Sequence, residues 1–201
     1  AVYRQEMMIM ELLTNINDDN WRRPIYFATT VDRNLYMNLQ SSNFSLTGLA
    51  YQVVPGIPQS SGVNTEKAYD NLMNKFRWGG LEENPDIYLD ETSRRMISTF
   101  RLYFNQLIEA LIEESKNDKA VAALDKATTV MPGKAVAYGN DGILFARAYY
   151  RLGETEKAKQ LMGEIEQRLQ DNLSWYDRLT PRQMSNTMVD IYYNVNSLLL
   201  I

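Results

Sequence analysis

The chain has 201 residues, with 21 Lys and Arg against 25 Asp and Glu, a formal net charge of −4, and neither Cys nor His. The lack of Cys excludes disulfides, thiolate zinc sites, iron–sulfur clusters and Cys nucleophiles. The lack of His excludes a Ser-His-Asp triad and removes the commonest transition-metal ligand. Neither half of the sequence is basic, which argues against a binder of duplex nucleic acid. No apolar run approaches the roughly 18 residues that a membrane-spanning helix needs, so no membrane span is expected in this chain.

The sequence begins at Ala1, without an initiator Met or a signal-peptide pattern, and an apolar helical pattern starts almost at once. We therefore expect the chain to be a piece of a longer protein. The alternative is a complete protein that has been processed or trimmed at its N-terminus.

Residues 1–64 predict a small α/β head. Apolar residues at helical spacing predict a helix over 3–16. Two β-prone runs, at 25–30 and 49–54, predict short strands, and residues 33–39 between them have the pattern of one or two helical turns. A strand, a short crossover and a second strand fit a small parallel pair, although so short a crossover leaves the pairing direction open.

Residues 65–201 predict helices throughout. A first helix is expected from Thr65 to Phe76, and Asp90 is a candidate N-cap for a long helix. The clearest start signal is Thr180-Pro181-Arg182-Gln183, which combines an N-cap Thr, Pro at the first helical position and Gln three residues after the cap. The predicted fold class is α+β and mainly helical, with a strand-containing head followed by helical hairpins.

Two helical hairpins are predicted at about 104–132 and 142–169, with the flanking helices as caps. Each opens its second helix with a Lys-Ala pair, Lys119-Ala120 and Lys157-Ala158, which lie 38 residues apart. This pattern resembles the tetratricopeptide repeat, whose period is about 34 residues. The chain departs from the repeat at Ile108, where a small residue is usual, and the second hairpin lacks the closing Pro.

By the tetratricopeptide resemblance, a concave face would bind a protein or peptide segment. The residues that this resemblance places on the face are Asn105, Glu109, Arg147, Tyr150 and Arg151. The alternative is a compact helical bundle that binds no ligand.

Arg22 and Arg23 stand beside Trp21 and form a candidate anion contact, because guanidinium groups bind phosphate and carboxylate bidentately. The simpler interpretation is that one Arg pairs with a nearby carboxylate while Trp21 packs against the protein.

Five carboxylates fall within residues 82–91, a density that would suit a hard cation or an acid/base pair. Their spacing lacks the Gly that a calcium loop needs, and Asp90 is explained as a helix cap. No Gly-x-x-x-x-Gly-Lys phosphate loop is present. The sequence therefore assigns no catalytic, cofactor-binding or metal-binding residue.

The first half carries a more specific set of motifs. They are Asn20-Trp21-Arg22-Arg23-Pro24-Ile25-Tyr26-Phe27-Ala28, Leu46-Thr47-Gly48-Leu49-Ala50-Tyr51-Gln52-Val53-Val54-Pro55, Tyr69-Asp70-Asn71-Leu72-Met73, Phe76-Arg77-Trp78-Gly79-Gly80 and Tyr88-Leu89-Asp90-Glu91. As a set they resemble the soluble C-terminal region of a bacterial multi-spanning membrane protein family of poorly known function, described as similar to protein O-mannosyltransferases. The resemblance covers most of residues 20–170, in blocks.

This resemblance implies a place on the outer, periplasmic face of the cytoplasmic membrane, as part of a longer membrane protein. It also implies that the chemistry lies in the membrane half, so no catalytic residue can be transferred to this chain. The main hypothesis is a non-catalytic accessory domain of a membrane glycosyltransferase-like protein, which positions acceptor protein or partner subunits. The membrane half of its own chain is a further candidate partner. The alternatives are a stand-alone helical-repeat adaptor that binds peptide segments and, least favoured, a soluble carboxylate-based hydrolase.

Overall fold

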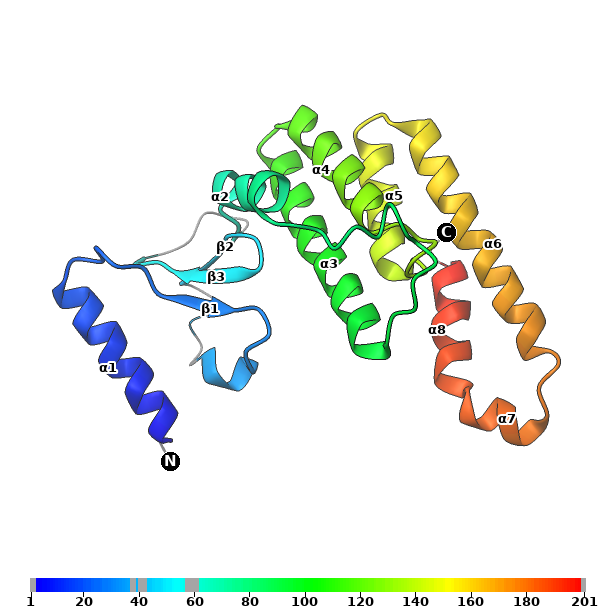
Figure 1. The fold of residues 1–201 in the computed structure, drawn as a ribbon, viewed down its shortest axis with the longest axis horizontal. Coiled ribbons are helices and arrows are strands. Elements are labelled where there is room, and N and C mark those ends of the chain that lie inside the picture. Colours follow the sequence, from blue (N-terminus) through cyan, green and yellow to red (C-terminus); the bar gives the residue numbers. More distant parts are fainter. Residues whose placement is uncertain (1–2, 37–38, 40–42, 57–61, 200–201) are drawn as a thin grey trace. The chain divides into compact units, whose positions relative to one another are not determined.

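The computed structural model describes residues 3–36, 39, 43–56 and 62–199. The chain forms two compact units, Ala1–Phe76 and Arg77–Ile201, which are described one at a time (Figure 1). The prediction of an α+β, mainly helical fold is confirmed: a small sheet lies in the first unit and helices make up the second.

The first unit opens with helix α1 (Arg4–Asp18), as the apolar spacing predicts. The backbone N–H of Tyr3 donates to the Glu6 carboxylate at 2.7 Å, which satisfies this backbone donor at the N-terminus of the helix. Ile9 and Leu13 pack against the core of the unit, and Ile16 is buried. The apolar stripe of α1 therefore covers that core.

The sheet has three short strands, β1 (Tyr26–Ala28), β2 (Phe44–Leu46) and β3 (Ala50–Val53), in the order β1-β3-β2. Both pairs are antiparallel, so the parallel pair that the sequence pattern would fit is not formed, and the pairing direction that the sequence leaves open is fixed. The connection from β1 to β3 holds a 3₁₀ helix (Arg33–Tyr36) and the extra strand β2, which reverses the chain through a tight turn into β3. Strands joined by a tight turn run antiparallel, so the hairpin gives β3 the direction opposite to that of β2.

Aromatic rings fill the core of the first unit. Phe27, Tyr36, Phe44 and Val53 are buried together. The Phe44 ring centroid lies 5.2 Å from that of Phe27 and 5.1 Å from that of Tyr36. Tyr51 adds a stacked ring 5.4 Å from Phe44. Strands this short depend on such ring contacts, because a small sheet is marginal without a packed face.

Helix α2 (Thr65–Asp70) and a π-helical turn (Asn71–Lys75) end the first unit, over the range predicted for a helix. The Asn71 side chain donates to the Thr47 carbonyl at 2.6 Å and ties this turn to the β2–β3 connection. Gly48 lies in that connection with φ +123°, and a Cβ there would come within 3.2 Å of the Phe76 ring. Glycine is needed at this position for both reasons.

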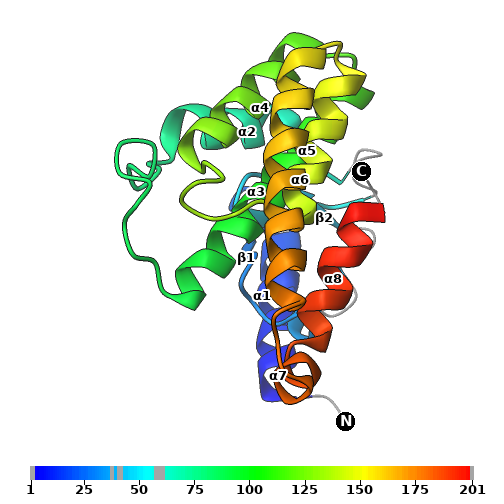
Figure 2. The ribbon, with the colours of Figure 1, turned by 90° about the vertical axis from the view of Figure 1, so that its right-hand side faces the viewer.

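The second unit is helical. Helix α3 packs against α4, α5 against α6, α3 against α5, and α6 against α8 (Figures 1 and 2). The helices are α3 (Glu91–Glu113), α4 (Asn117–Val130), α5 (Asn140–Arg151), α6 (Thr155–Tyr176), α7 (Pro181–Asn186) and α8 (Met188–Leu199). Fully buried small residues, among them Ala120, Ala127, Ala146 and Ala158, let neighbouring helices approach closely.

Two ends differ from the sequence pattern. Helix α6 runs to Tyr176, past the expected end near residue 169, because no Gly or Pro follows in the sequence between 169 and 176. The last predicted helix is divided into α7 and α8 at Thr187, whose hydroxyl donates to the carbonyls of Gln183 and Met184. Such back-bonding bends helices. The capping box at Thr180 and Gln183 is confirmed.

Candidate functional site: an ionic groove in the helical unit

A cluster of polar side chains joins α4, α5 and α6. The Asp125 carboxylate accepts a hydrogen bond from the Tyr149 hydroxyl at 2.8 Å, and the Lys157 ammonium donates to both of its oxygens at 2.8 Å. Burial, with a smaller contribution from Asp125, raises the pKa of the Tyr149 phenol. The hydrogen bond with Asp125 raises the pKa of Lys157. At neutral pH both groups therefore stay protonated and hold the carboxylate in place.

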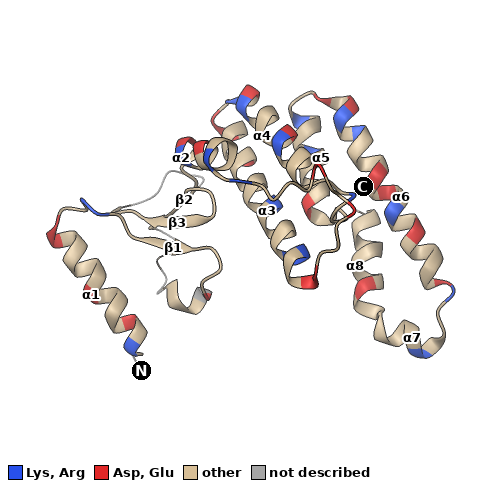
Figure 3. Cartoon of the chain, in the orientation of Figure 1, with Lys and Arg blue, Asp and Glu red and all other residues tan. Residues whose placement is uncertain are grey.

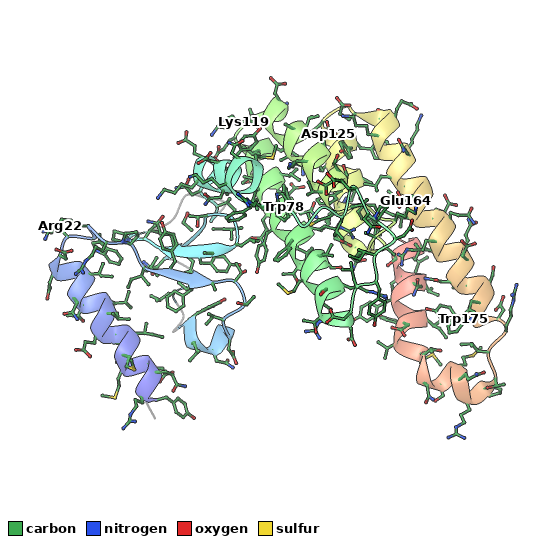
Figure 4. The ribbon with its side chains drawn as sticks, viewed as in Figure 1. Arg22, Trp78, Lys119, Asp125, Glu164 and Trp175 are labelled. Carbon is green, nitrogen blue, oxygen red and sulfur yellow. The ribbon has the colours of Figure 1, made fainter. Side chains whose placement is uncertain are left out.

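This cluster forms part of the wall of a groove of about 470 Å³. A groove of that volume falls in the range of small-ligand sites. Asp125 on α4 and Glu164 on α6 mark two of its walls (Figure 4). The remaining lining comes from α4, α5, α6 and the α4–α5 loop: Thr128, Thr129, Pro132, Gly133, Lys134, Tyr138, Tyr149, Lys157, Gln160 and Leu161. Charged, hydroxyl and amide groups thus surround the groove.

A fully buried arginine fixes the loop that lines the groove. Arg101 on α3 is 0% exposed, and its guanidinium pairs with Asp141 at 2.9 Å. It also donates to the carbonyls of Met131 at 2.8 Å and Val136 at 2.6 Å, and lies 4.2 Å from the centroid of the Tyr138 ring. These contacts fully engage the guanidinium, as a buried cation requires. Its role in this structure is to position the loop.

Two glycines make room for Tyr138. A Cβ on Gly133 would lie 2.5 Å from the Tyr138 ring, and one on Gly142 would lie 2.5 Å from the Tyr138 Cβ. Real Cβ atoms do not approach so closely, so a larger residue at either position would displace the ring. Burial raises the pKa of Tyr138 to about 12, which keeps the phenol neutral under ordinary conditions.

The residues predicted for the interaction face fall into two groups. Arg147, Tyr150 and Arg151 are exposed on α5, and Arg151 forms an ion pair with Glu109 on α3. Asn105 is buried, 5% exposed, and its amide donates to the Asp141 carbonyl at 3.2 Å. Four of the five residues are thus brought to an α3–α5 surface, and Asn105 joins the same two helices from inside. We call Glu109, Arg147, Tyr150 and Arg151 the α3–α5 face.

Two exposed leucines, Leu102 on α3 and Leu144 on α5, come from the same pair of helices, at 42% and 36% exposure. Charges of both signs are distributed over α3 to α6 (Figure 3). The surface offered by these helices therefore combines apolar and charged side chains, as interface surfaces do.

Arg22 and Arg23 lie on the surface of the first unit. Both side chains are exposed, at 78% and 80%, and both approach the carboxylate of Asp19. Trp21 packs against the aromatic core. This geometry matches the simpler interpretation of the motif, in which a nearby carboxylate pairs with Arg.

Two carboxylates of the acidic run 82–91 make structural contacts. Asp90 is the N-cap of α3 and accepts the Ser93 backbone N–H at 2.7 Å. Its interaction with the Ser93 side chain, and next this backbone hydrogen bond, lowers the pKa of Asp90. Asp86 pairs with Lys134 at 2.9 Å. Over residues 3–36, 39, 43–56 and 62–199, no group of three or more acidic side chains is arranged to hold a metal ion.

No helix among the described residues of the chain is both long and apolar enough to cross a membrane.

The groove itself was not predicted. Asp125 is separated from Tyr149 by 24 residues and from Lys157 by 32, so no local motif links them. Arg101 could have been found, because it interrupts the apolar stripe of α3 four residues after Ile97 and three before Phe104, both of which are buried. A charged residue on an apolar helix face must have a buried partner.

In a comparison with known protein families, residues 1–72 match the family model of the TMEM260-associated domain 2. The matched segment is the strand-containing unit up to the π-helical turn, and it is less than half of the chain. The first unit is thus similar to that domain. Neither the curated proteins nor the solved structures contain a significant match to the chain.

Proposed function

We propose that this chain is an extracytoplasmic accessory region of a membrane glycosyltransferase-like protein, and that its helical unit holds an acceptor protein or a partner subunit. The observation that carries the proposal is the similarity of residues 1–72 to the TMEM260-associated domain 2. The motif resemblance to a protein O-mannosyltransferase-like family supports the same parent. In this proposal the reaction takes place elsewhere in the parent protein, and the part described here is non-catalytic.

The helical unit supplies the surface for the partner. Stacked helical hairpins present extended faces that bind polypeptide segments. On the α3–α5 face, Tyr150 is 45% exposed beside Arg147 and the Glu109–Arg151 ion pair. An exposed aromatic ring next to guanidinium groups is a typical anchor for a protein partner. This composition supports a role in holding protein.

The test uses the full parent protein in its native membrane. Arg147→Glu with Tyr150→Ala reverses one charge and removes the exposed ring of the α3–α5 face, without touching a buried residue. We expect glycosylation of protein acceptors to fall by about tenfold or more, because anchor residues contribute about 2 kcal/mol each. Mass spectrometry of the acceptors would measure the change.

Arg182→Glu with Tyr192→Ala is the matched control, since it makes the same chemical changes at exposed positions of α7 and α8. We expect it to leave acceptor glycosylation close to that of the unaltered protein. If the face variant glycosylates every acceptor normally, the proposed positioning role is wrong.

A stand-alone helical-repeat adaptor is the second candidate, favoured by the exposed Leu102, Leu144 and Tyr150 on α3 and α5. It differs from the first in the size and place of the native protein. Fractionation of native cells, with an antibody against the helical unit, would find the adaptor as a soluble band near 23.3 kDa. A much heavier band in the membrane fraction would support the membrane parent.

A further inference from the structure

A second, smaller cavity of about 190 Å³ adjoins the groove in the helical unit. Its lining shares Gly133, Tyr138 and Glu164 with the groove and adds Ala137, Ile165 and Arg168. The two cavities therefore lie next to each other between the α4–α5 loop and helix α6, and we call them together the recess. Lys157, Gln160, Glu164 and Arg168 lie three or four residues apart along α6, so they follow one side of this helix.

Arg168 is the unusual group in this recess. Its Nε–H is buried and donates to no acceptor among the described residues. No carboxylate in the described part of the chain lies within ion-pair distance of its guanidinium. Arg101, by contrast, has a partner for each of its three nitrogens. A buried donor without a partner costs free energy, and the half-buried side chain of Arg168 lines the smaller cavity.

The electrostatics favour a single negative charge. Burial lowers the pKa of Arg168, which shows that desolvation of the cation is not fully compensated by Asp141 and Glu164. A carboxylate matches the guanidinium in shape and accepts two parallel hydrogen bonds from it. A doubly charged group would be repelled more strongly by the nearby Glu164 and Asp141.

We propose that the Arg168 cavity binds the carboxylate of an acidic side chain, Asp or Glu, from an extended peptide that lies along the adjoining groove. The volume of about 190 Å³ accommodates a side chain, while the larger groove offers Thr129 and Gln160 for hydrogen bonds to a peptide backbone. This site does not depend on the proposed parent protein, and it uses none of the residues of the α3–α5 face.

The test follows the arginine Nε–Hε resonances of the whole chain by NMR. The probe is the peptide acetyl-Gly-Gly-Asp-Gly-Gly-amide, and its Asn analogue is the uncharged control, both at constant ionic strength. We expect the Asp peptide to shift the Arg168 resonance in a saturable way and the Asn peptide to leave it in place. Sodium acetate tests a free carboxylate, and we expect it to bind more weakly because it makes no groove contacts.

Two variants address the site itself. Arg168→Gln removes the charge, and Ala137→Met keeps the arginine while filling the cavity that Ala137 lines. Each should weaken binding of the Asp peptide by about tenfold or more, the loss expected for a charge-assisted hydrogen-bonded pair. Arg178→Gln, at an exposed arginine just after the same helix, should bind as the unaltered chain does.

Glu164→Gln should tighten binding of the Asp peptide, because it removes from the cavity lining a negative charge that repels the carboxylate of the peptide. Equal binding of the Asp and Asn peptides, or equal loss in the Arg168 and Arg178 variants, would overturn the proposal. Binding of acetate without binding of the Asp peptide would overturn the assignment to a peptide side chain. Circular dichroism of each variant shows whether it is folded. If Arg168→Gln does not fold, the peptide binding of Ala137→Met tests the proposed site.

Discussion

The two units use charged residues differently. In the first unit the ion pairs between described residues are local: Asp19 pairs with Arg22 and Arg23, and Asp70 pairs with Lys75. The second unit has local pairs too, such as Lys159 with Glu156, but there other ion pairs also connect separate helices. Arg101 and Asp141 join α3 to α5, Glu109 and Arg151 join the same two helices, and Asp125 and Lys157 join α4 to α6.

This difference follows from the architecture of each unit. A three-stranded sheet brings distant segments together through its backbone hydrogen bonds, and the aromatic side chains of the first unit then fill its core. Helices satisfy their backbone groups internally, so their packing must be specified by side chains. In the second unit, buried and half-buried charged pairs add directional contacts between hairpins to the apolar packing.

The largest expected effect comes from the buried pair of the second unit. Asp141→Ala leaves the guanidinium of Arg101 buried without its charge partner, and it removes the acceptor for the Gly139 backbone N–H. We expect the free energy of unfolding of this unit to fall by about 3–5 kcal/mol. Urea denaturation, followed by the ¹⁹F resonance of 5-fluorotryptophan at Trp78, would measure it, since this ring contacts Phe100 and Phe104.

Glu109→Ala is the matched control, because it also removes a carboxylate that pairs with an Arg of the neighbouring hairpin, but at an exposed site. It should cost less than about 1 kcal/mol. The double variant Arg101→Met with Asp141→Leu should regain much of the loss, since an apolar pair leaves no buried charge. Equal costs for the buried and exposed pairs would show that burial does not set the importance of these contacts.

The first unit should respond to a loss of ring packing instead. Phe44→Ala removes a side chain that is 3% exposed and contacts the rings of Phe27, Tyr36 and Tyr51. We expect a loss of about 3 kcal/mol in the stability of this unit. The ¹⁹F resonance of Trp21, which packs on the same core, reports it. Asp19→Asn, which affects only local ion pairs, should change stability by less than about 1 kcal/mol; a larger effect would contradict the division between the units.

Much of the helical unit could be predicted because its signals are local. Capping residues such as Asp90 and Thr180 act within three residues, and their hydrogen bonds are present. Apolar spacing locates the helices for the same reason. The groove could not be predicted, because its cluster of Asp125, Tyr149 and Lys157 is assembled only when three helices pack.

The sheet shows a different limit. Strand β2 is three residues long, too short for an alternating pattern to stand out, and it was not predicted. Without β2, the predicted strands at 25–30 and 49–54 are separated by a segment that resembles a short crossover, and the sequence leaves their pairing direction open. The direction in which β1 and β3 pair depends on β2, and the local sequence pattern does not show that strand.

The last prediction concerns how the stability of the second unit depends on alkaline pH, through the buried phenol of Tyr138. The folded-state pKa of Tyr138 is raised by burial to about 12, above the ordinary value of 10. The neutral phenol is therefore favoured in the folded state, and its stabilising contribution is complete below pH 10. As the pH rises toward 12, the unfolded chain ionises first, so stability falls, by about 2 kcal/mol near pH 12.

Tyr138→Phe removes this titration, together with a long hydrogen bond of 3.4 Å to the Met131 carbonyl. At pH 8 the variant should be slightly less stable than the unaltered chain. Between pH 10 and 12 its free energy of unfolding should fall by less. Tyr149 and Lys157 also have raised pKa values, so they too lower the stability of the unit at alkaline pH. The stability of the variant therefore still falls with pH, but less steeply. In the first unit the resolved shift is the lowered pKa of Asp70, caused chiefly by its hydrogen bond with Lys75, and that contribution is lost at acid pH. An unchanged slope for Trp78 unfolding in Tyr138→Phe would show that the phenol ionises freely, and hence that the α4–α5 loop does not bury it in solution.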